Sequence, residues 1–256
     1  MILAIDAGNS TVGFGFFEGR DLVLSLKAES RPGATPDEYS AFLRSHMRQA
    51  NIAPEAVGGA VISSVVPPLV HVFFEALKGM TDASPLVVSG RLKLGIKIKY
   101  RTPETLGPDR IAAAHAAFEK YGGPVAVVDF GTATTISVVD KGGSFLGGMI
   151  APGLMTGFVA LTGRAAALKS FGLTYPRSAI GADTEECVQS GVILGHAAMV
   201  DGMLGRVDSE LGADAAVVAT GGLAGLALPH MARKTSVEPH LVLQGLASIF
   251  VLNTSY

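Results

Sequence analysis

The chain has 256 residues, enough for one large domain or for two smaller domains that each bury a core. Its 20 basic and 22 acidic residues nearly balance, and no basic run of the kind that neutralises phosphates is present, so we expect no nucleic-acid partner. The single cysteine, Cys187, excludes an internal disulfide framework and suits a reducing compartment.

The apolar segments do not have the pattern of membrane spans or targeting signals. The N-terminus, MILAIDAGNS, lacks a basic leader and places Asp6 inside its apolar run, unlike a signal peptide. The uncharged stretches 142–163 and 215–232 are interrupted by glycines and by a proline, which is typical of loops joining core elements. We therefore expect a soluble cytoplasmic protein with no membrane partner.

The first half of the chain alternates strand and helix patterns. Short apolar runs joined by glycine-containing turns predict a meander of three strands over 2–6, 12–17 and 21–27. A helix is expected from Pro36, with Thr35 as its N-cap and Glu38 completing a capping box. Further along we expect, in order, a buried strand over 58–64, a helix over 67–78, a strand over 85–89, a polar loop over 100–110, and a helix that leads out of that loop.

The pattern then restarts. A second three-strand meander is predicted over 125–129, 134–140 and 144–149, with helices following to the C-terminus. ILAIDAGNSTVGFGFF (2–17) and VAVVDFGTATTISVVD (125–140) superimpose at a constant offset of 123 residues. Asp6 then falls on Asp129, Gly8 on Gly131 and Thr11 on Thr134, which favours a duplicated α/β fold with domains 1–115 and 116–256.

Each copy places an aspartate, a glycine and hydroxyl residues directly after a buried strand. A buried carboxylate is costly unless it is paired, and VVDFGTATTISVV contains no lysine or arginine beside Asp129. A hairpin of this kind offers backbone N–H groups and hydroxyls to an anion, while its aspartate holds an accompanying cation. The alternative is a pair of simple tight turns, in which Asp and Gly are common. The repetition favours phosphate binding.

Two further motifs allow a structural and a functional interpretation. VVATGGLAG (217–225) joins a strand to a helix through Gly221 and Gly222, either as a simple turn or as a support for adenine or ribose. In GPDR (107–110), Asp109 lies near a helix N-terminus, as a capping residue or as the acceptor of a substrate proton. Arg110 then either balances that charge, binds an anionic substrate, or lies on the surface.

These motifs in this order resemble the acetate and sugar kinase, Hsp70 and actin superfamily, and most closely its type III pantothenate kinases. The resemblance covers essentially the whole chain. It rests on DAGNS (6–10), the Tyr100 loop with GPDR, DFGTATT (129–135), GGMIAPG (147–153) and ATGG (219–222), with Ser10 where threonine is more usual. It implies actin-like (ribonuclease H-like) domains with an ATP cleft between them, each a mixed sheet with flanking helices.

The resemblance also implies a reaction and a set of site residues. The reaction would be ATP-dependent phosphorylation of pantothenate to 4′-phosphopantothenate, with ATP and Mg²⁺ as cofactors and Asp109 as the catalytic base. The residues implied for ATP are Asp6, Ala7, Gly8, Asn9, Ser10, Thr11, Val12, Gly13 and Thr132. The residues implied for pantothenate are Tyr100, Gly107, Pro108, Asp109, Arg110 and Thr184.

The family further implies a homodimer with a long helix at its interface, and a monovalent cation, K⁺ or NH₄⁺, at Asp129. A non-catalytic nucleotide-binding regulator on the same scaffold is the alternative function, since a fold does not fix an activity. The six histidines show no metal-ligand spacing. We expect Cys187 to lie in the core, because apolar residues surround it in a helical pattern.

Overall fold

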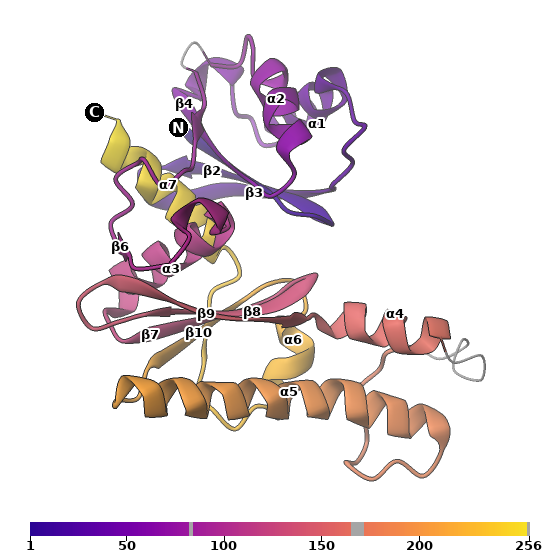
Figure 1. The fold of residues 1–256 in the computed structure, drawn as a ribbon. Helices are drawn as coiled ribbons and strands as arrows, with labels where there is room; N and C mark the ends of the chain where they lie inside the picture. Colours follow the sequence, from indigo (N-terminus) through magenta and orange to yellow (C-terminus); the bar gives the residue numbers. More distant parts are fainter. Residues whose placement is uncertain (82–83, 165–171, 255–256) are drawn as a thin grey trace. The chain divides into compact units, whose positions relative to one another are not determined.

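The computed structural model describes residues 1–81, 84–164 and 172–254 (Figure 1). The chain divides into two compact units. Unit 1 comprises Met1–Glu119 and His240–Tyr256, and unit 2 comprises Lys120–Pro239. The α/β class predicted from the sequence is confirmed, because each unit contains a mixed sheet with helices packed on it.

Unit 1 is built on a five-stranded sheet of order β3-β2-β1-β4-β5. β1 pairs antiparallel with β2 and parallel with β4, and residues of α1 and α2 join the core on one face of this sheet. Its elements are β1 (Ile2–Ala7), β2 (Thr11–Glu18), β3 (Asp21–Glu29), α1 (Pro36–Gln49), β4 (Gly59–Ser64), α2 (Pro67–Ala76), β5 (Leu86–Val87), β6 (Lys97–Ile98), α3 (Pro108–Tyr121, whose last two residues belong to unit 2) and α7 (Leu241–Asn253).

In unit 2, strands run in the order β11-β10-β7-β8-β9. β7 pairs antiparallel with β8 and parallel with β10, and residues of α4, α5 and α6 join the core on one face. Its elements are β7 (Val125–Phe130), β8 (Ala133–Val139), β9 (Ser144–Pro152), α4 (Leu154–Arg164), α5 (Thr184–Leu211), β10 (Ala216–Thr220), α6 (Ala224–Ala227) and β11 (Ser236–Val237).

The predicted meanders are both present, and so is the capping box of α1. The Thr35 hydroxyl accepts from the Glu38 N–H, and the Glu38 carboxylate accepts from the Thr35 N–H at 2.7 Å. The strand predicted over 85–89 shortens to the two residues of β5, and no sequence pattern indicates the two-residue strands β6 and β11.

The constant offset of the repeat is wrong beyond the turn. Ala7 pairs with Val12 in unit 1, whereas Phe130 pairs with Thr134 in unit 2, so the second hairpin is one residue shorter. The offset is 123 up to the glycine and 122 afterwards, and Thr134 corresponds to Val12, not to Thr11. The burial patterns of β2 and β8 match at the offset of 122. A slip of one residue would turn every side chain of the strand to the other face of the sheet.

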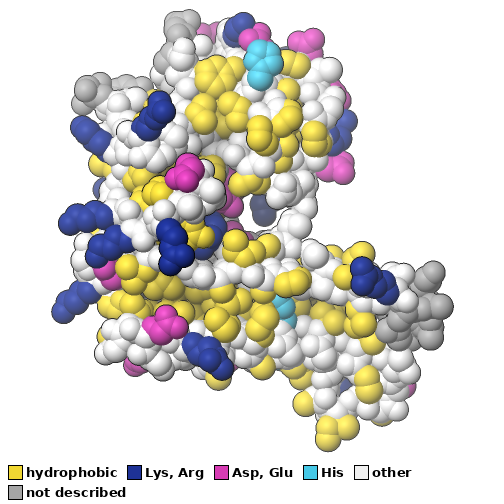
Figure 2. Space-filling view, viewed as in Figure 1, with side chains coloured by type: hydrophobic (Ala, Val, Ile, Leu, Met, Phe, Trp, Pro, Cys, Tyr) yellow, Lys and Arg dark blue, Asp and Glu magenta, His cyan; other side chains and the backbone are white. Residues whose placement is uncertain are grey.

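Unit 2 exposes several large apolar side chains (Figure 2). Ile150 of β9 is 66% exposed and Val159 of α4 is 57% exposed, with Met155 and Leu161 of the same helix also exposed. Met155 and Val159 are four residues apart and therefore share one face of α4, and we call these two residues the α4 patch. Among the described helices, α5 is the one long and apolar enough to cross a membrane, yet its buried residues pack into the core of unit 2.

The predicted domain division differs from the structure at the end of the chain. The repeat predicts that residues 240–256 belong to the second domain, but α7 packs on β1, β4 and β2 of unit 1. Glycines make this packing possible: a Cβ on Gly59 would lie 2.3 Å from the Phe250 ring, and Gly13 and Gly15 face Leu243. The boundary itself lies after Glu119 and not after His115.

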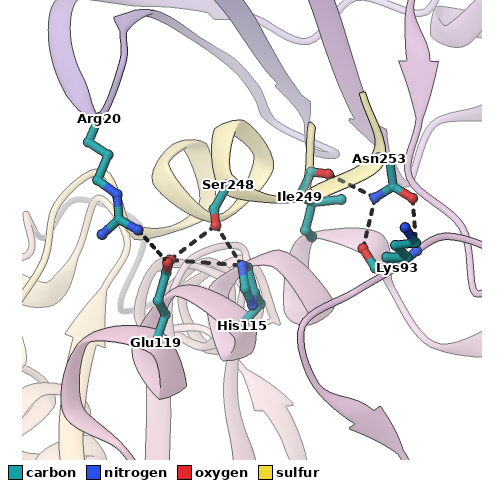
Figure 3. Close-up of polar contacts among 7 residues, drawn as sticks. All are labelled: Arg20, Lys93, His115, Glu119, Ser248, Ile249 and Asn253. Atoms are coloured by element: carbon teal, nitrogen blue, oxygen red, sulfur yellow. Dashed lines mark hydrogen bonds and ion pairs between the residues drawn. The ribbon is translucent and has the colours of Figure 1, made fainter. Parts of the chain in front are cut away.

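Helix α7 also fixes α3 in place (Figure 3). Ser248 of α7 donates to the Glu119 carboxylate at 3.1 Å and lies 2.8 Å from His115 Nε2. Arg20 completes the group with an ion pair to Glu119 at 3.0 Å. Burial lowers the pKa of His115, and the charge of Glu119 partly opposes that effect, so a neutral ring suits this contact.

The two helices approach each other closely at Gly245, where a Cβ would lie 2.0 Å from the carbonyl oxygen of Ala112. Gly245→Ala should therefore lower the free energy of unfolding by about 1–3 kcal/mol through overpacking. Gly205→Ala on α5 is the control, because nothing lies within 4 Å of its Cβ position and alanine favours a helix by about 1 kcal/mol. Urea unfolding of both variants checks this, and a stabilised Gly245→Ala would contradict the close crossing.

Candidate active site

The first candidate turn follows β1 in unit 1. The Gly8 N–H donates to Thr11 O at 3.0 Å and closes the turn, while Asn9, Ser10 and Thr11 are exposed. A Cβ on Gly8 would approach Thr11 O to 3.1 Å, so glycine suits the close turn. The turn thus exposes backbone and hydroxyl groups, which are suitable donors for an anion.

Asp6 lies at the end of β1, on the face of the sheet opposite to the Leu3 and Ile5 side chains that join the core with α1 and α2. The Ser63 hydroxyl of β4 donates to Asp6 Oδ1 at 3.0 Å. Sequence reasoning missed Ser63, because pairing of β1 with β4 is a long-range contact and Ser63 belongs to no motif.

The second turn follows β7 in unit 2. The Gly131 N–H donates to Ala133 O at 3.1 Å, and Thr132 is exposed at the tip. The carbonyl oxygen of Thr132 accepts from the Gly153 N–H at 3.1 Å and from the Thr156 hydroxyl at 2.6 Å. A Cβ on Gly153 would lie 2.3 Å from Gly131 O, so the GGMIAPG motif ends in a glycine that supports this turn.

Asp129 lies beside the Gly-Gly turn. Gly221 has φ +96°, and a Cβ there would lie 2.5 Å from Asp129 Oδ1. The Leu223 N–H donates to Phe130 O at 3.1 Å and holds the two segments together. The ATGG motif, for which the sequence allows a simple turn or a nucleoside support, therefore also encloses the carboxylate of Asp129.

The buried hydroxyl of Thr134 lies behind this turn. It is 2.8 Å from His196 Nε2 of α5, and burial lowers the pKa of His196. Thr134 therefore has a structural partner on the core side of the sheet, and it does not reach the turn surface that Thr132 occupies.

Asp109 lies in the first turn of α3, which begins at Pro108 as predicted. The Ile111 N–H donates to Gly107 O at 3.2 Å, and a Cβ on Gly107 would lie 2.3 Å from Asp109 Oδ1. The carboxylate therefore folds back over a position that only glycine leaves open. Among the described residues, Oδ1 is buried and has no hydrogen-bond partner.

Burial raises the pKa of the Asp109 carboxyl above its ordinary value. The backbone N–H groups of Arg110 and Asp109 and the charge of Arg110 act in the opposite direction but do not cancel this effect. A carboxylate with a raised pKa in a partly dry environment is a stronger proton acceptor than one in water.

The predicted site residues divide between the units. Unit 1 holds the β1 turn and the Asp109 loop, and Tyr100 and Arg110 are half-buried within it. Unit 2 holds Asp129, Thr132 and Thr184. Thr184 is exposed at the first position of α5, and the N-cap is Asp183, which accepts from the Glu186 N–H at 2.9 Å.

The prediction that Cys187 is buried is wrong. Its side chain is exposed on the first turn of α5, where the thiol faces Gly181 O at 3.5 Å. The residues of α5 that enter the core begin further along the helix. Among the residues that the structure describes, no cluster of three or more His, Cys, Asp or Glu side chains is arranged to hold a metal ion.

The chain is similar to known proteins over nearly its whole length. A family model described as type III pantothenate kinase matches residues 2–206. A type III pantothenate kinase of Thermomicrobium roseum is 42% identical over 98% of this chain and 96% of its own length. One of Moorella thermoacetica is 40% identical over 99% and 100%, respectively.

A solved structure, (R)-2-hydroxyglutaryl-CoA dehydratase component A of Acidaminococcus fermentans, has a TM-score of 0.59 at 15% identity, over 97% of this chain and 96% of that one. At this identity the likeness concerns the fold alone. It confirms the predicted class of actin-like domains.

Proposed function

The chain belongs to the type III pantothenate kinase family, and we propose that it transfers the γ-phosphoryl group of ATP to the primary hydroxyl of pantothenate. The product is 4′-phosphopantothenate, and the reaction is the first step of coenzyme A biosynthesis. Membership of the family over nearly the full chain supports the substrate and the reaction. The observation in this chain that carries the proposal is the buried, under-bonded carboxylate of Asp109.

Asp109 acts as the general base. Its Oδ1 atom accepts the proton of the substrate hydroxyl as that oxygen attacks phosphorus, and the raised pKa of the carboxyl favours this transfer. Gly107 gives the carboxylate its orientation, since any side chain there would displace it. Tyr100, Pro108, Arg110 and Thr184 complete the proposed pantothenate contacts, with Arg110 suited to the pantothenate carboxylate.

The β1 turn binds the phosphates of ATP. The residues from Asp6 to Gly13 supply backbone N–H groups and the hydroxyls of Ser10 and Thr11, and Thr132 does the same from the second turn. When bound with ATP, Mg²⁺ would supply positive charge that neutralises the phosphates. Mg²⁺ in such sites takes only one or two carboxylates beside phosphate and water, so Asp6 fits it without a cluster of acidic residues.

Asp129 holds a monovalent cation, K⁺ or NH₄⁺. Its Oδ1 atom lies in a cradle that a Cβ on Gly221 would fill, next to backbone of the Gly-Gly turn. Carboxylate and backbone oxygens are suitable donors for such a cation, which would add positive charge near the transferring group.

We further propose a cytoplasmic homodimer that binds neither nucleic acid nor membrane. The single cysteine suits a reducing compartment, and the nearly balanced charge does not favour a polyanion. The α4 patch offers an apolar surface that a second copy of the chain would cover. The long helix α5, which is only partly buried, is the proposed interface helix.

Asp109→Asn tests the base directly. The change is nearly isosteric and removes only the proton acceptor, so ADP formation that depends on pantothenate should fall by about 10²–10⁴-fold. In the native protein, kcat should fall on acidification, with a midpoint above the ordinary aspartate value of about 3.9, because the base must be ionised and its pKa is raised.

A coupled ADP assay across pH measures both effects, with calorimetric ATP binding as the control for folding. Native-like turnover by Asp109→Asn would remove this residue from the mechanism. If the native protein formed no ADP with pantothenate while still binding ATP, the regulator alternative would replace the kinase.

Replacement of the cation tests the role of Asp129. Turnover should be low in buffers with only sodium or tetramethylammonium and should rise on addition of K⁺ or NH₄⁺. Asp129→Asn should flatten this response, because the amide lacks the charge that holds the cation. Equal turnover of the native protein in K⁺ and in tetramethylammonium would contradict a cation at Asp129.

A charge in the α4 patch tests the dimer. Val159→Asp places a carboxylate in the apolar surface and should shift the protein from dimer to monomer in sedimentation equilibrium. Val23→Asp on β3 is the control, since Val23 is 49% exposed in unit 1. If both variants sediment as the native protein does, the α4 patch is not the interface.

A further inference from the structure

A buried hydroxyl residue stands beside the turn aspartate in both units. In unit 1, Asp6 of β1 is in register with Ser63 of the parallel neighbour β4. In unit 2, Asp129 of β7 is in register with Thr220 of the parallel neighbour β10. The sequence repeat does not include these hydroxyl residues, because neither offset of the meander maps Ser63 onto Thr220.

The two positions are equivalent in the folds of the two units. Paired residues of neighbouring strands point to the same face of a sheet. Asp6 and Ser63 lie opposite to the core that contains α1 and α2, and Asp129 and Thr220 lie opposite to the core that contains α5. Ser63 is 0% exposed and Thr220 is 3% exposed, so water does not readily replace either hydroxyl.

The buried Ser63 hydroxyl needs a hydrogen-bond partner, and Asp6 provides it. It ends a run of apolar residues, GAVI, and a buried hydroxyl is unfavourable unless it is hydrogen-bonded. Its bond goes to Asp6 Oδ1 at 3.0 Å. The next residue, Ser64, differs: its hydroxyl accepts from the Val66 N–H at 3.0 Å and donates to Val66 O at 2.9 Å, so it serves the backbone alone.

We propose that Ser63 and Thr220 are positioning residues, which set the orientation of Asp6 and Asp129 toward the cations that accompany ATP. The inference rests on the proposed kinase function for the identity of the ligand. A donor on one carboxylate oxygen selects one rotamer of a short side chain, and it withdraws that oxygen from competing partners. In unit 1 the parallel neighbour strand supplies this donor, the Ser63 hydroxyl. In unit 2 the parallel neighbour strand places Thr220 in register beside Asp129, at the equivalent position.

Ser63→Ala tests the first pair, with Ser64→Ala as the matched control. A hydrogen bond to a charged group is worth about 1.5–3 kcal/mol, so loss of the Ser63 hydroxyl should raise both the KM for Mg²⁺–ATP and the calorimetric Kd for Mg²⁺–ADP by roughly tenfold or more. The KM for pantothenate should stay unchanged. Ser64→Ala should leave the nucleotide constants unchanged, even where it lowers the melting temperature as much.

Thr220 offers a separate and nearly isosteric test. Thr220→Val removes the hydroxyl and keeps the volume, so it should weaken activation by K⁺ and the K⁺ dependence of Mg²⁺–ADP binding. Thr220→Ser keeps the hydroxyl and should retain both. If Thr220→Val and Thr220→Ser lose the response equally, packing and not the hydroxyl is responsible, and the inference fails for Asp129.

Two results would overturn the inference for Asp6: an unchanged Kd for Mg²⁺–ADP in Ser63→Ala, or equal increases in Ser63→Ala and Ser64→Ala. Binding of Mg²⁺–ADP requires no pantothenate. A native protein that bound the nucleotide but did not phosphorylate pantothenate would therefore defeat the proposed function, while the comparison of Ser63→Ala with Ser64→Ala would still support or overturn the positioning role.

Discussion

The placement of a half-buried carboxylate near the end of an apolar strand is the constraint on which both candidate turns depend. Asp6 and Asp129 each interrupt a strand whose neighbouring residues enter a core. Such a group is stable only where nearby atoms compensate its charge. In unit 1 the Ser63 hydroxyl contributes to this compensation, and in unit 2 the absence of a side chain on Gly221 lets backbone enclose the carboxylate. The need to compensate the charge of each aspartate therefore accounts for the hydroxyl beside Asp6 and the glycine beside Asp129.

Asp109 meets the same constraint at a helix N-terminus. Its carboxylate folds over Gly107, is buried, and keeps one oxygen without a hydrogen-bond partner among the described residues. This is unfavourable for stability but useful for proton transfer, since burial raises the pKa. The position of the group depends on α3, which α7 holds through the close approach at Gly245 and the contact of Ser248 with His115. Residues of α7 thereby support the loop that carries Asp109.

Sequence patterns predicted the local features well, because they depend on neighbours in the chain. The Thr35 capping box, the start of α3 at Pro108 and both meanders follow from short-range chemistry. Long-range features could not be predicted this way. The return of α7 to unit 1 and the pairing of Ser63 with Asp6 depend on contacts between distant segments, and the shorter second hairpin is visible only in the strand register.

The pKa of the Asp109 carboxyl tests the central claim most directly, namely that burial prepares a specific carboxylate for chemistry. It can be measured by ¹³C NMR on protein labelled at the aspartate carboxyl carbon, with Asp109→Asn identifying the resonance. The predicted result is a pKa above the ordinary aspartate value of about 3.9, because desolvation outweighs the N–H contacts and the charge of Arg110. A pKa at or below that value would contradict the claim.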